Sequence, residues 1–169
     1  RALYESDPSN FDWQNAIITE SGFTQNHFLG LMANTGIIRV APSFSYSTQD
    51  GLLKNTGFVR YSFRNNVDIT PSEKVNIKID AAVTNRNRTQ IASEGTIWNY
   101  LGRMPTNLPI RHPNGMWAEG WVKNNPVAFI EEGGNRKTNN LEFYGNISLN
   151  VKPVEWLSLN ATVAPRYET

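Results

Sequence analysis

Polar and apolar residues alternate along much of this chain, and the alternation recurs in six runs. In the run that begins at Ile38, Val40 and Phe44 share one face, while Arg39 and Ser45 share the other. A period of two places successive side chains on opposite faces of a β-strand. The pattern therefore predicts an all-β, antiparallel chain of six strands, at residues 24–33, 38–47, 58–69, 75–88, 141–151 and 157–163.

The connections between the runs are alternately short and long. Short turns that contain Gly or Pro are predicted at 34–36, 70–73 and 152–155, whereas longer links occupy 48–57 and 91–137. Outer-membrane β-barrels have short periplasmic turns and longer extracellular loops. Predicted strands of about 10 to 14 residues are long enough for a tilted crossing of a bilayer. The pattern favours a transmembrane β-barrel segment.

A soluble β-sandwich also alternates, so an extracellular sandwich module that binds polysaccharide is the alternative interpretation. Sandwich strands average about 5 to 6 residues, and the predicted runs are longer. Six strands fall short of the roughly eight found in the smallest outer-membrane barrels. An open sheet edge in lipid leaves backbone groups without hydrogen-bond partners. We therefore expect these strands to belong to a larger barrel.

Composition narrows the function classes. Hydrophobic residues make up 39% of the chain and aromatic residues 11%, which is too aromatic for a disordered segment. No stretch approaches the roughly 18 to 20 apolar residues that a spanning helix needs. The net charge of +1 gives no electrostatic case for nucleic acid. The absence of cysteine excludes thiolate metal ligands and a cysteine nucleophile.

Candidate catalytic residues are few. Glu131 and Glu132 form the only acidic pair, and two glycines follow them, as in a solvated turn. His27 and His112 are the only histidines, and neither has spaced Asp, Glu or Cys partners that would suggest a metal site. We predict no enzyme activity, no metal site and no cofactor.

Three motifs follow one another along the chain. The first is Asp-Trp-Gln-Asn-Ala-Ile at 12–17, with Phe-Thr-Gln-Asn-His at 23–27; the second is residues 50–62. The third combines Arg103-Met104-Pro105, residues 112–115 and residues 125–128. In this order they resemble the plug-to-barrel junction, an early strand link and the early extracellular loop of SusC/RagA-type TonB-dependent transporters of Bacteroidetes. The turn at 34–36 departs from that family, which usually has a Gly-Gly pair and a longer charged turn there.

This resemblance implies a plugged barrel of about 22 strands in the outer membrane of a Gram-negative bacterium. It would import oligosaccharide or peptide fragments with a SusD-like surface lipoprotein, powered by TonB through an N-terminal region absent here. Residues 1–22 would be the plug-to-barrel junction and residues 23–169 the N-terminal part of the barrel, with a long extracellular loop at about 91–137. The junction motif disfavours a passive porin-like barrel.

The long loop is rich in aromatic and amide side chains. Aromatic faces stack on sugar rings, and amides and guanidinium groups bond hydroxyls. The same residue types also concentrate in protein interfaces, so packing of the loop on itself or on the lipoprotein is the competing interpretation. The candidate substrate-binding residues are Trp117, Trp121, Arg103 and Asn114.

The alternation also assigns faces. Tyr46, Tyr61 and Trp156 lie near predicted strand ends, where outer-membrane barrels have girdles of aromatic residues. We expect Phe44, Phe63, Ile79 and Phe143 to face lipid. We expect Arg39, Arg64, Lys78 and Glu142 to face the lumen.

Overall fold

The computed structural model describes residues 11–169, so the first ten residues of the predicted junction lie outside the described part. The chain forms two compact units. The sheet unit comprises residues 24–48, 59–87 and 138–169. The helical unit comprises residues 11–23, 49–58 and 88–137.

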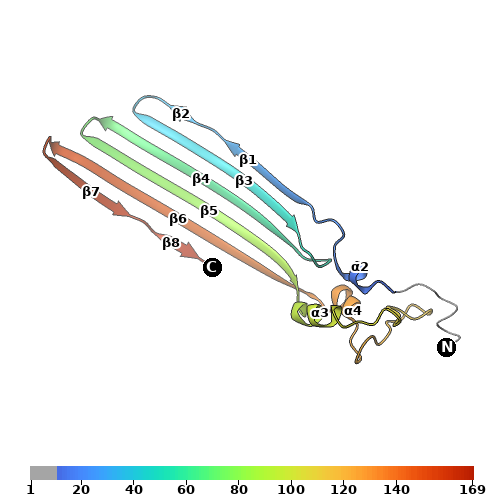
Figure 1. Ribbon diagram of the computed structural model, residues 1–169. Coiled ribbons are helices and arrows are strands. Elements are labelled where there is room, and N and C mark those ends of the chain that lie inside the picture. The colour runs from blue at the N-terminus through green and yellow to red at the C-terminus, as the bar shows by residue number, and fades with distance from the viewer. Residues whose placement is uncertain (1–10) are drawn as a thin grey trace. The chain divides into compact units, whose positions relative to one another are not determined.

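Strands dominate the chain and form one sheet (Figure 1). Its order is β1-β3-β4-β5-β6-β7, with β2 also beside β3 and β8 also beside β6. β1 and β2 are consecutive segments of the first predicted strand, and β8 follows β7, which occupies the sixth, so the eight segments correspond to six predicted strands. The strands are β1 (Thr24–Gly30), β2 (Ala33–Asn34), β3 (Ile38–Asp50), β4 (Gly57–Ser72), β5 (Val75–Ile91), β6 (Asn135–Val154), β7 (Leu157–Val163) and β8 (Arg166–Glu168).

Both outermost strands are interrupted. Between β1 and β2 the chain leaves strand geometry, although the Leu31 N–H still donates to the Pro42 carbonyl at 3.0 Å. Between β7 and β8 stands Pro165, which lacks the N–H that a ladder needs. Its carbonyl accepts from the Gly145 N–H at 2.9 Å, and pairing resumes at Arg166 opposite Tyr144. The last strand thus continues beyond its predicted end.

Two predicted turns were wrong in position. We expected turns at 70–73 and 152–155, but β4 continues through Pro71 to Ser72 and β6 through Pro153 to Val154. Proline is tolerated at a strand end, where its missing N–H costs no ladder bond. The turns are the residue pairs 73–74 and 155–156. The predicted turn near residue 35 is present, with Gly36 at a φ of +90°.

The central strands are long, at 13, 16, 17 and 20 residues for β3 to β6. On the apolar face, Phe44, Phe63 and Phe143 are 43%, 49% and 38% exposed. Within residues 11–169 all strands belong to this one sheet, so no second sheet covers those aromatics. A β-sandwich buries such a face against a second sheet. The fold is therefore an antiparallel barrel segment and not the alternative sandwich module.

The helical unit has its own small core. It contains α2 (Trp13–Ile17), α3 (Glu94–Leu101) and α4 (Pro126–Glu131), none of which was predicted. Trp13, Ile17 and Leu53 pack with side chains of the long loop, and the Trp13 indole N–H donates to the Leu108 carbonyl at 3.2 Å. All three sequence motifs thus contribute to one core, whose buried members are Trp13, Ile17, Leu53, Ile91, Ile97, Leu101, Val127 and Ile130.

Among the helices of residues 11–169, none combines the length and apolar character needed to span a bilayer.

Candidate functional site

The predicted Asn114-Gly115 turn is present and closes a small hairpin in the long loop. The Asn114 side-chain oxygen accepts from the Met116 N–H at 3.1 Å, and Gly115 has a φ of +83°. Arg111 and Trp117 pair in an isolated antiparallel β-bridge at the base of this hairpin. This geometry places Trp117 beside Arg111.

Trp117 is engaged inside the loop. Its indole N–H donates to Glu132 Oε1 at 2.7 Å, and the Arg111 guanidinium carbon lies 3.3 Å from the ring centroid. Arg111 in turn donates to Glu131 at 2.7 Å. The two glutamates of the acidic pair therefore hold the indole and its stacked arginine. A cation over an aromatic face is attracted by the ring quadrupole, so one face of Trp117 is already occupied.

Trp121 has a different environment, because its side chain is 47% exposed. It pairs with Asn124 across a turn in which Val122 and Lys123 have φ values of +47° and +63°. Positive φ is an outlier for a β-branched residue such as Val122. Preceding the turn, Gly120 has a φ of +63°, and a Cβ there would meet the Asn124 carbonyl. The strained turn presents Trp121 and Val122 to solvent.

Arg103 lies just after α3, where its N–H donates to the Tyr100 carbonyl at 2.9 Å. Its side chain is exposed and forms no ion pair within the described chain. Of the four predicted residues, the structure brings Asn114 and Trp117 together in one hairpin. Trp121 lies in the next hairpin, and no hydrogen bond among residues 11–169 links Arg103 to the others.

The polar face of the sheet carries ordered charge pairs. Arg39 lies 3.1 Å from Asp68 on the neighbouring strand. Glu142 lies 2.8 Å from Arg86 and 3.0 Å from Arg166, so it bridges two strands. Asp80 accepts from the Asn146 amide at 3.1 Å. These contacts place Arg39 and Glu142, two of the predicted lumen residues, in a polar surface that continues across the sheet.

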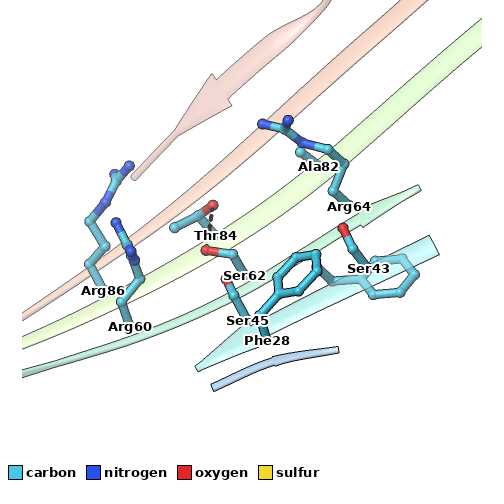
Figure 2. A pocket seen from close by; sticks show the side chains of 10 residues that line it. Phe28, Ser43, Ser45, Arg60, Ser62, Arg64, Ala82, Thr84 and Arg86 are labelled. Atoms are coloured by element: carbon cyan, nitrogen blue, oxygen red, sulfur yellow. Dashed lines mark hydrogen bonds between the residues drawn. The ribbon is translucent and has the colours of Figure 1, made fainter. Parts of the chain in front are cut away.

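A cavity of about 340 Å³ lies on this sheet (Figure 2). The sequence analysis predicted neither this cavity nor a role for Phe28. The Phe28 ring covers Gly30, and a Cβ on Gly30 would come within 3.1 Å of that ring. The alternation placed each strand's polar residues on one face, but the cavity depends on which residues of four strands, β1, β3, β4 and β5, lie beside one another. It is lined by Phe28, Ser43, Ser45, Arg60, Ser62, Arg64, Ala82, Thr84 and Arg86, and also by Phe63, which the alternation assigns to the opposite, apolar face.

The apolar face has an aromatic row at one end. Ring centroids are 6.0 Å apart for His27 and Tyr46, and 5.2 Å apart for Tyr46 and Tyr61. Trp156, in the turn after β6, is 84% exposed. On β6 the apolar positions run from Leu141 to Val151, which at ~3.4 Å per residue and a ~40° tilt spans roughly 25 Å, the height of a barrel's apolar band.

The described residues include no group of three His, Asp or Glu side chains placed to hold a metal ion. The surfaces that stand out are the loop around Trp117 and Trp121, the charged face of the sheet and its apolar face.

Comparison with known proteins gives a consistent result. The chain matches no protein-family profile. It is 24% identical, over 98% of its length, to TonB-dependent receptor P26 of Formosa agariphila, and spans 17% of that protein.

Among solved structures, the RagAB peptide importer in its closed-closed state matches 94% of the chain with a TM-score of 0.72 at 16% identity. A second RagAB peptide transporter structure matches 92% with a TM-score of 0.66 at 17% identity. The chain spans about a fifth of those chains. The matches confirm the barrel-segment fold class and the resemblance to SusC/RagA-type transporters.

Proposed function

We propose that this chain is part of the wall of a TonB-dependent transporter, which imports oligosaccharide or peptide fragments across the outer membrane of a Gram-negative bacterium. One observation carries the proposal: a single sheet of long antiparallel strands has an uncovered apolar face and a charged opposite face. A barrel in lipid needs this division, because alternate residues face the acyl chains and the lumen. The similarity to a TonB-dependent receptor over 98% of the chain supports it.

The sheet edges support a larger barrel. Within residues 11–169, no strand lies beyond β1 or β7 in the sheet order. In the hydrocarbon region each unpaired backbone group costs several kcal/mol, so we infer that further strands complete the wall. The compared proteins are several times longer than this chain. We propose a plugged barrel of about 22 strands, in which residues 1–22 form the junction to the plug and residues 23–169 begin the wall.

We assign the long loop at 91–137 to the extracellular side. It carries the exposed apolar side chains Met116, Trp121 and Val122, and exposed aromatics are typical of binding surfaces. We propose that this loop contacts a SusD-like lipoprotein and the substrate. Trp121 is the first candidate for substrate contact, and Trp117, Arg103 and Asn114 of the same loop are further candidates.

The proposed activity is transport, with no reaction catalysed by these residues and no cofactor. The compared proteins are named as a receptor, a peptide importer and a peptide transporter. In this proposal TonB supplies the energy for import.

Nutrient uptake by intact bacteria tests the proposal. The full-length gene is deleted and then restored either intact or without the segment that contacts TonB. Growth is measured on a defined oligosaccharide mixture and on a peptide mixture. We expect the deletion to abolish growth on at least one of the two. Only the intact gene should restore that growth. Equal growth of all strains on both nutrients would contradict the proposed transport.

A further inference from the structure

We propose that Arg60, Arg64 and Arg86 form a binding site for an oxyanion, a carboxylate or sulfate group, carried by a solute inside the barrel. The proposal rests on the assignment of the charged face to the lumen. The site is the cavity of about 340 Å³ on the sheet unit (Figure 2). Three arginines line it, and no carboxylate does.

Strand pairing forces two of these cations together. The Thr84 hydroxyl donates to the Ser62 hydroxyl at 3.3 Å, which places these two residues of β5 and β4 side by side. Two residues farther along each antiparallel strand, Arg60 and Arg86 are therefore opposite one another. Figure 2 shows them side by side. Like charges directly opposite in a sheet are destabilising, and a bound anion would remove that repulsion.

Two other arginines of the sheet have carboxylate partners within the wall. Arg39 pairs with Asp68, and Arg166 contacts both Glu142 and Glu168. Arg86 shares Glu142 with Arg166. Among residues 11–169, Arg60 and Arg64 have no carboxylate within ion-pair distance. Two positive charges at the cavity are therefore not compensated by the described chain.

The remaining lining suits a ligand with several oxygens. Ser43, Ser45, Ser62 and Thr84 offer hydroxyl groups that can donate to it. Guanidinium groups bind carboxylate and similar oxyanions through paired N–H donors, and these charge-assisted bonds are stronger than neutral ones. Phe28 adds an apolar side chain to the lining. It would contact the carbon ring or chain that bears the ligand's charged group.

Arginine modification of the full-length transporter in detergent tests this site. Phenylglyoxal is added with sodium sulfate as the probe or with sodium chloride at equal ionic strength, and modified peptides are quantified by mass spectrometry. We expect sulfate to slow modification of Arg60 and Arg64 by about threefold at a concentration of about twice its Kd. Arg39, which is paired with Asp68, serves as the internal control and should react equally in both salts.

A matched pair of variants completes the test. Arg60→Gln should abolish the protection of Arg64 by sulfate, whereas Arg39→Gln should leave it unchanged. The proposal is overturned if Arg60 and Arg64 react equally in both salts. It is also overturned if neither reacts in chloride, because a group of the transporter itself would then occupy the cavity. Both results leave the uptake experiment unaffected, so failure of this site differs from failure of the proposed transport.

Discussion

Two tryptophans of the long loop, Trp117 and Trp121, differ in how much of their surface is free. Trp117 gives its N–H to Glu132 and one ring face to Arg111. Trp121 has neither kind of contact among the described residues and stands at a strained turn. Backbone strain of this kind clusters at ligand-binding segments, where surrounding structure maintains it. At the residue scale, the substrate hypothesis therefore rests more on Trp121 than on Trp117.

Single substitutions separate the two roles. We expect Trp121→Ala to raise the substrate Kd roughly fivefold, since stacking contributes about 1 kcal/mol, with unchanged membrane abundance. Trp117→Ala should make the loop more sensitive to protease, because Glu132 and Arg111 lose their partner. Binding titrations and limited proteolysis of the full-length transporter measure both effects. Trp98→Ala, at a second exposed tryptophan, is the control. An unchanged Kd for Trp121→Ala would assign that side chain to partner contact or loop packing.

At the element scale, α4 is organised by one residue. Asn125 is 7% exposed, and its side-chain oxygen accepts from the N–H groups of Val127 and Ala128. Its amide donates to the carbonyls of Ile110 and Ala118 at 2.8 and 2.9 Å. Asn125 thus caps the helix and also fixes two other segments of the loop.

Replacing this residue should loosen the helical unit. We expect Asn125→Ala to lower its free energy of unfolding by about 2–4 kcal/mol, from the lost cap and the buried groups left unpaired. Amide hydrogen exchange should rise across residues 91–137 and stay unchanged in the sheet. The exposed Asn107→Ala is the matched control. Equal exchange in both variants would rule out the organising role of Asn125.

The strands could be predicted and the helices could not. Strand alternation persists over ten or more residues, so β3 to β6 were recognisable from sequence. Helices α3 and α4 have eight and six residues, which is too short for a clear helical period. Asn125-Pro126 was a usable signal, because Asn is favoured at the N-cap and Pro at the first helical position. The cavity required the pairing register, which no single strand contains.

At the scale of the whole molecule, the proposed topology places the long loop outside the cell and the short turns in the periplasm. The structure provides a lysine at each end: Lys123 is exposed in the long loop, and Lys74 is exposed in the turn between β4 and β5. In the proposed topology, trypsin added to intact cells should cleave after Lys123 and not after Lys74. Cleavage after Lys74 should require a ruptured outer membrane. The reverse pattern would invert the topology.

The division of the sheet into a lipid face and a lumen face is the central claim, and adjacent residues of β5 test it most directly. Lys78 and Ile79 point to opposite faces, and the chain contains no cysteine of its own. A nitroxide is attached to Lys78→Cys or Ile79→Cys in the full-length transporter reconstituted in lipid vesicles. Its relaxation by oxygen and by a water-soluble nickel complex is then measured. We predict that oxygen dominates at position 79 and nickel at position 78. Equal accessibility to nickel at both positions would contradict the barrel wall.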